Sequence, residues 1–60
     1  MSYLFELVDR ALNGQLVNEL RARRQDGKSH ETIAREFYAE TSIPVSSDTV
    51  GRWCKKIGAD

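Results

Sequence analysis

Apolar residues recur along this chain at intervals of three and four positions, the spacing that gathers them on one side of an α-helix. Glycine-containing turns and the single proline interrupt the pattern and divide the 60 residues into four segments. No run of alternating apolar and polar residues is long enough to predict a strand. The pattern therefore predicts an all-α fold, a small three- to four-helix bundle, in one domain over residues 1–60.

Two short helical segments are predicted in the N-terminal half, at residues 2–13 and 15–26. Asn13 and Gly14 separate them, and glycine is common just past the end of a helix. Because one glycine inside a helix costs only about 1 kcal/mol, one bent helix over residues 2–26 is an open alternative. In either form these residues would brace the rest of the chain. Their apolar stripes are formed by Leu4, Leu7, Val8, Ala11, Leu12, Leu16, Val17 and Leu20.

A third helix is predicted at residues 29–42, with Ser29 as its N-cap residue. It must end before Pro44, because the residue that precedes a proline is driven out of helical geometry. The connection that follows carries Ile43 and Val45, and we expect both side chains to pack beneath the turn. The apolar stripe of this helix is formed by Ile33, Ala34, Phe37 and Tyr38.

The last helix, predicted at residues 46–57, has the clearest division between an apolar and a polar side. Either Ser46 or Ser47 can be its N-cap, and Gly58 ends it. Its apolar residues, spaced at i, i+3, i+4 and i+7, are predicted to lie in the core. They are Val50, Trp53, Cys54 and Ile57. The opposite side and its flank carry Ser47, Asp48, Thr49, Arg52, Lys55 and Lys56.

The size and composition of the chain argue against catalysis and against membrane insertion. A core built from 60 residues leaves little room for a substrate pocket. His30 and Cys54, the single histidine and the single cysteine, cannot form a zinc site unaided, and no glycine-rich phosphate loop is present. We therefore expect no enzyme activity, no metal and no cofactor. Short apolar runs and a lone cysteine favour a cytoplasmic protein that does not span a membrane.

Charge is distributed unevenly, although the formal net charge is zero. Residues 1–20 sum to −2 and residues 21–60 to +2, and the charged residues at positions 50–58 are all basic. A locally basic helix beside an acidic N-terminal segment is compatible with binding DNA through one face. A second basic cluster is interpreted as a solvated helix end, with a binding patch as the alternative. It consists of Arg21, Arg23 and Arg24.

The two C-terminal helices and their connection form a helix-turn-helix pattern, in which the second helix enters the major groove of DNA. The first turns of that helix would read base edges, and its last turn would meet phosphates. The start of the preceding helix adds Ser29 and His30 as candidates, although a solvated first-turn residue is the simpler interpretation of His30. The candidate base contacts are Ser47, Asp48, Thr49 and Arg52, and the candidate phosphate contacts are Lys55 and Lys56.

Residues 28–36 and 42–53 resemble the helix-turn-helix of small DNA-binding proteins from actinobacteria and their phages. The most specific part is Val-Ser-x-x-Thr-Val-x-Arg-Trp at residues 45–53. The resemblance covers about residues 14–57. Related three-helical domains, of the homeodomain-like kind, occur in transposases and resolvases. It implies DNA binding, in the control of transcription or of recombination.

Two positions depart from that pattern. Ser42 stands where the turn prefers glycine, and Gly51 stands where a basic residue is common. The function expected is sequence-specific binding of double-stranded DNA by a transcriptional regulator, such as a phage or prophage repressor. One alternative is a recombination accessory protein of the excisionase kind. Another is a protein-interaction module that has lost DNA binding, which the zero net charge and Gly51 would favour.

The cluster Tyr3-Leu4-Phe5 raises the question of a second copy of the chain. Three consecutive large apolar side chains cannot all face one small core, because successive residues of a helix point about 100° apart. At least one of them is expected to be exposed or covered by a partner. Packing over the bundle and a homodimer through the N-terminal helix are the two interpretations.

Overall fold

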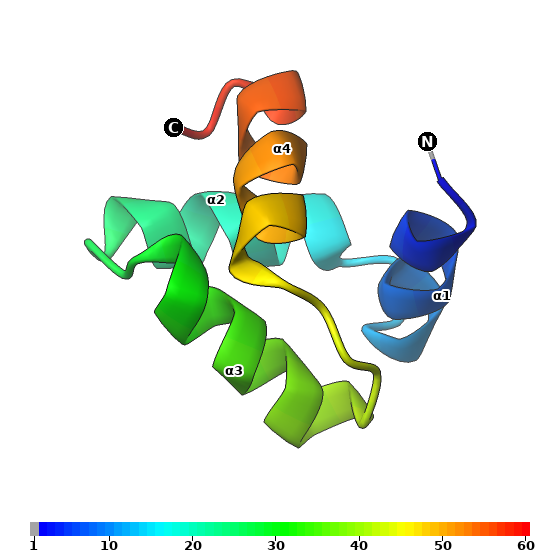
Figure 1. The fold of residues 1–60 in the computed structure, drawn as a ribbon. Coiled ribbons are helices and arrows are strands. Elements are labelled where there is room, and N and C mark those ends of the chain that lie inside the picture. The colour runs from blue at the N-terminus through cyan, green and yellow to red at the C-terminus, as the bar shows by residue number, and fades with distance from the viewer. Residues whose placement is uncertain (1) are drawn as a thin grey trace.

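The computed structural model describes residues 2–60, and these form helices and no strand. Figure 1 shows the elements α1 (Tyr3–Ala11), α2 (Leu16–Gln25), α3 (His30–Thr41) and α4 (Ser47–Ile57). The all-α fold predicted from the apolar pattern is confirmed, and each helix lies within its predicted segment. Among the residues described, none of the helices is long and apolar enough to cross a membrane.

The N-terminal half contains two separate helices, so the alternative of one bent helix is wrong. Asn13 and Gly14 both have left-handed backbone conformations, with φ of 57° and 78°, and the helical hydrogen bonds break there. The carboxylate of Asp9 then accepts a hydrogen bond of 3.0 Å from the backbone N–H of Leu16. This contact satisfies one of the free donors at the start of α2. A side chain of α1 therefore caps the helix that follows it.

Serine side chains begin the other helices. Ser2, Ser29 and Ser46 are the N-caps of α1, α3 and α4, and each accepts the backbone N–H three residues further on. Ser46, and not Ser47, thus starts the last helix. The turn after α3 begins with Ser42 in the left-handed conformation, at φ of 61°. Serine keeps the geometry that glycine would give, at the conformational cost of a Cβ atom in that region.

The core draws on every helix. It consists of Phe5, Val8, Leu16, Leu20, Ile33, Ala34, Phe37, Val50, Trp53 and Cys54. The rings of Phe5 and Trp53 meet edge to face, with 5.2 Å between their centroids, and this contact fastens α1 to α4. Ile43 and Val45 pack against the cluster from the turn, as the sequence predicts.

Two apolar assignments made from the sequence are wrong. Tyr38, expected in the buried stripe of α3, is 56% exposed. At about 100° per residue, it lies at the edge of the stripe that is centred between Ile33 and Phe37. Ala11 is exposed, while Phe5, which the predicted stripe omitted, is buried. Phe5 is buried against Trp53 of α4, a contact between helices that the spacing along α1 cannot reveal.

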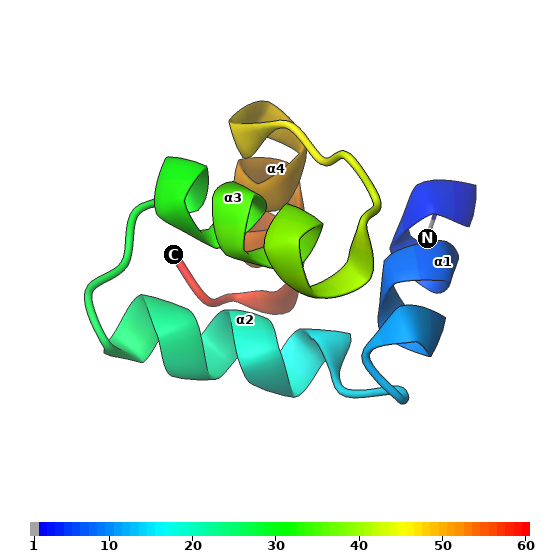
Figure 2. The same ribbon diagram turned by 90° about the horizontal axis from the view of Figure 1, so that it is seen from below.

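One long side of α4 is turned away from the rest of the molecule. In Figure 1, α2 passes behind α4, α1 stands to one side, and α3 runs below its N-terminal end. Figure 2, seen from below, shows α2 along one edge of the fold, with the C-terminal end of α4 close to it and the N-terminal end of α4 pointing away. The side of α4 that faces away from α2 is therefore open to a partner.

Candidate nucleic-acid interface

The outer face of α4, defined here as Ser47, Asp48, Thr49, Arg52, Lys55 and Lys56, contains most of the candidate residues. All are exposed except Thr49, which is half-buried. The opposite side of the same helix buries Val50, Trp53 and Cys54, as the stripe predicts. The same periodicity thus anchors the helix on one side and presents polar groups on the other.

Hydrogen bonds order the first turns of this outer face. The Ser46 hydroxyl accepts the backbone N–H of Thr49 at 3.1 Å and donates to the Thr49 hydroxyl oxygen at 3.0 Å. That oxygen also accepts from the Arg52 guanidinium, at 3.3 Å. The guanidinium is held along the helix surface by a single neutral contact, so most of its donors remain available to a ligand.

The basic groups of the outer face lack carboxylate partners. Among residues 2–60, Arg52, Lys55 and Lys56 make no ion pair. Together with Asp48, the charges of this face sum to +2. The formal net charge of zero therefore conceals a locally positive surface, which long-range attraction toward polyanions requires.

Arg23, by contrast, is enclosed by acids of its own chain. Its guanidinium lies 3.0 Å from Glu19, 2.8 Å from Glu36 and 2.8 Å from Glu40, and 4.9 Å from the centre of the Phe37 ring. Its side chain is only 13% exposed. The hydrogen bond that Arg23 donates to Glu40 is the largest of the effects that raise the pKa of Arg23. Arg23 therefore fastens α2 to α3, and its interpretation as a solvated helix end is wrong.

The neighbours of Arg23 are also engaged within the chain. Lys28 pairs with Glu36 at 2.8 Å, and this hydrogen bond lowers the pKa of the Glu36 carboxyl. Arg24 donates to the backbone oxygen of Lys28 at 2.6 Å. Of the basic cluster proposed as an alternative binding patch, Arg21 alone is fully exposed. Arg21 and Arg24 line a small hollow together with the acid Asp60, and Arg23 is directed away to the glutamates, so the three arginines do not form one basic surface.

Ser29 and His30 lie beside α4 and not on its outer face. The Ser29 hydroxyl is used within α3, where it accepts the backbone N–H of Thr32 at 3.1 Å. The His30 ring packs against Gly51, at which an added Cβ atom would lie 3.2 Å from Nδ1 of the ring. His30 is therefore half-buried, which corrects its interpretation as a solvated residue. Gly51 allows the start of α3 to approach α4 closely, a packing role that the sequence pattern does not reveal.

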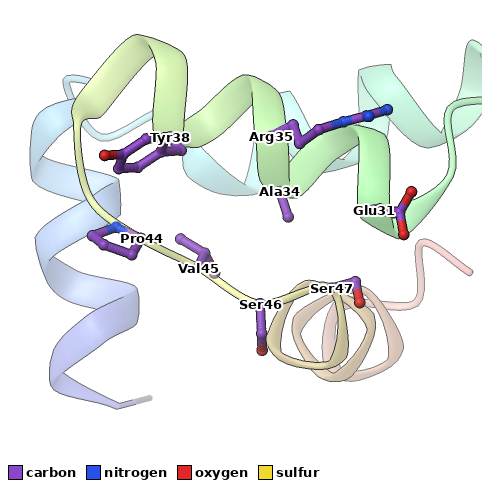
Figure 3. A pocket seen from close by; sticks show the side chains of 8 residues that line it. All are labelled: Glu31, Ala34, Arg35, Tyr38, Pro44, Val45, Ser46 and Ser47. Atoms are coloured by element: carbon purple, nitrogen blue, oxygen red, sulfur yellow. The ribbon is translucent and has the colours of Figure 1, made fainter.

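Two open grooves flank the outer face. The first, which we call the turn groove, lies between α3 and the connection to α4 and has a volume of about 640 Å³. In Figure 3, Tyr38 stands at one end and Glu31 at the other, with Ala34 and Val45 between them. The groove is lined by Glu31, Ala34, Arg35, Tyr38, Pro44, Val45, Ser46 and Ser47. It contains one acidic and one basic residue, Glu31 and Arg35, so its net charge is zero.

The second groove, which we call the α1 groove, lies between the N-terminal end of α1 and α4, with a volume of about 330 Å³. It is lined by Ser2, Leu4, Thr49, Arg52, Trp53 and Lys56. Sequence reasoning missed Ser2 and Leu4, because no periodic pattern along the chain links α1 to α4. Both charged residues of this groove are basic.

Cys54 is held in the core and away from both grooves. Burial raises the pKa of its thiol, so the reactive thiolate form is disfavoured at neutral pH. Within residues 2–60, the His, Cys, Asp and Glu side chains form no group of three that could hold a metal ion.

No family model, curated protein or solved structure matches this chain. The resemblance of residues 45–53 to helix-turn-helix proteins stays a prediction from the sequence. The function is inferred from the geometry of α4 and of the grooves beside it.

Proposed function

We propose that this chain binds double-stranded DNA sequence-specifically, through the outer face of α4, as a transcriptional regulator. The observation that carries the proposal is the gathering, on one face of α4, of three exposed basic side chains without ion pairs in the part of the chain that the structure describes. Arg23 and Lys28 are neutralised by glutamates, whereas Arg52, Lys55 and Lys56 have no carboxylate partner within residues 2–60. DNA phosphates would supply the missing counter-charge, and the counterions that they release would favour binding.

The position of α4 suits the major groove, which is about 12 Å wide and admits one α-helix. Its first turns carry small polar groups, Ser47 and Thr49, and the planar guanidinium of Arg52, all of which can hydrogen-bond to base edges. Lys55 and Lys56 lie in the last turn of α4, where the helix would leave the groove and contact the phosphates of the DNA backbone. An excisionase-like role in recombination would use the same contact. The setting we propose is the cytoplasm, where a regulator would meet its DNA.

A matched pair of charge reversals tests the proposal. Lys55 and Arg10 are both exposed and both lie in the last turn of a helix, so the two changes have similar effects on the helix dipole. We expect Lys55→Glu to weaken binding to a random duplex by at least about tenfold at low salt, because it places an acid beside phosphates. Arg10→Glu should change the affinity by less than about threefold.

Fluorescence anisotropy with a labelled duplex, at several salt concentrations, measures both effects. Circular dichroism of each variant confirms that the helices are retained. Equal losses from Lys55→Glu and Arg10→Glu would mean that only the net charge matters, and would remove α4 as the contact. A wild-type chain that does not bind duplex at low salt would end the proposal.

The turn groove favours a second candidate function, a protein-interaction module. It is mainly apolar, it carries no net charge, and Tyr38 is exposed at its edge. Exposed aromatic rings beside an apolar groove are typical of protein contacts. The duplex titration separates the two functions, because a protein-interaction module would not bind DNA even at low salt.

A homodimer through α1 also stays a prediction. Phe5 is buried and Leu4 packs against the core, so Tyr3, at 75% exposure, is the one large apolar side chain of the cluster left for a second copy. We expect a dimer to have twice the monomer mass at micromolar concentration, and Tyr3→Glu to dissociate it. Sedimentation velocity of both proteins, with and without duplex, measures this. A monomeric wild type in both conditions removes the dimer.

A further inference from the structure

We infer that the α1 groove seats the sugar–phosphate backbone of one DNA strand, so that α1 is part of the DNA contact and not only a brace. This inference rests on the proposed function, because it assigns an occupant to the surface beside the outer face of α4. The groove is lined by two basic residues, Arg52 and Lys56, and by two large apolar residues, Leu4 and Trp53. A strand backbone has the same two kinds of surface, anionic phosphates and the C–H faces of the sugars.

The charges select this groove over the turn groove. Within residues 2–60, neither Arg52 nor Lys56 makes an ion pair, and no acidic residue lines the α1 groove. The lining of the turn groove carries the acid Glu31 as well as Arg35. In the first groove a phosphate would contact Lys56, with the guanidinium of Arg52 directed at the bases adding positive charge nearby, whereas in the second it would meet a carboxylate. Coulomb attraction thus favours the α1 groove.

The position of the α1 groove beside the outer face of α4 also suits the backbone of a DNA strand. Thr49, Arg52 and Lys56 belong both to the outer face and to the wall of the α1 groove. A helix in the major groove has base edges in front of it and a strand backbone along its flank. With one strand in the α1 groove, the outer face would be turned toward the bases, and Ser2 and Leu4 would close the backbone in from the far side.

A single negative charge on the wall contributed by α1 tests the inference. Ser2→Asp keeps an N-cap residue at the start of α1, because aspartate caps a helix as well as serine does. Asn18→Asp is the matched control, since it adds the same charge to an exposed residue in the first turn of α2. Helix α2 runs along the edge of the fold from which the N-terminal end of α4 points away (Figure 2).

We expect Ser2→Asp to weaken binding to a duplex by about tenfold at low salt and to reduce the slope of affinity against salt by about one. Asn18→Asp should stay within about twofold of the wild type. Anisotropy titrations at several salt concentrations measure both values. Thermal melts followed by circular dichroism confirm that both variants remain folded.

Each other outcome has a definite meaning. Equal losses from the two variants would show a response to net charge alone and overturn the inference. No loss from Ser2→Asp, while Lys55→Glu still weakens binding, would place the backbone elsewhere and leave the proposed function standing. A wild-type chain that binds no duplex would instead overturn the proposed function itself, and the inference with it.

Discussion

We expect Trp53→Ala to abolish or severely weaken the cooperative thermal transition of this chain. Trp53 is only 5% exposed, and its ring meets Phe5 edge to face. Truncating a large aromatic residue in a core costs about 3–5 kcal/mol. A domain of this size has a total stability of only a few kcal/mol, at roughly 0.05–0.15 kcal/mol per residue. The loss is therefore comparable to the whole free energy of unfolding.

Circular dichroism at increasing temperature measures this effect. The midpoint should fall by at least about 12 °C, or the transition should disappear, since each kcal/mol shifts the midpoint of a small domain by about 4–8 °C. Tyr38→Ala is the control, because Tyr38 is an aromatic residue of the same chain that is 56% exposed. Its midpoint should change little. Similar midpoints for the two variants would contradict the role given to Trp53.

The second large effect is a contrast between Arg52 and Lys56 on the outer face of α4. Arg52 lies in the first half of the helix, and its planar fork matches the two acceptors that guanine presents in the major groove. Arg52→Ala should cost about 1–3 kcal/mol on a preferred site and relax the preference at one base pair. Lys56→Ala should weaken all sequences about equally and reduce the salt slope by about one.

Charge alone predicts no such contrast, because each substitution removes one positive charge. The preferred site is first selected from a random duplex pool, and both variants are then titrated against that site and a scrambled one at several salt concentrations. If both variants lose the same affinity for both duplexes, the outer face is a basic surface that does not recognise sequence. No loss from either would place the DNA contact outside α4.

The sequence alone predicts the last helix well. The spacing of Val50, Trp53 and Cys54 places them on one side, and the structure buries all of them. Serine at the start and Gly58 at the end mark its limits correctly. These features depend on residues less than a few turns apart, so the helical repeat of about 3.6 residues is enough to derive them.

Other features depend on contacts between helices, and there the sequence predictions fail or are missing. The acids around Arg23 come partly from α3, 13 and 17 residues further along the chain. The need for glycine at position 51 comes from the His30 ring, which belongs to another helix and leaves little room for a Cβ atom. Neither of these can be read from a periodic pattern, because the pattern does not specify how two helices cross.

The sequence by itself thus determined the class of fold, the limits of α4 and which side of α4 is polar. Each of these follows from short-range periodicity and from capping residues. The tertiary structure decided how fully Arg23 is neutralised, since the packing of α2 on α3 adds Glu36 and Glu40 to Glu19 of its own helix. It also decided that Ser2 and Leu4 form a groove with α4, because a groove exists only where two elements distant in sequence come together.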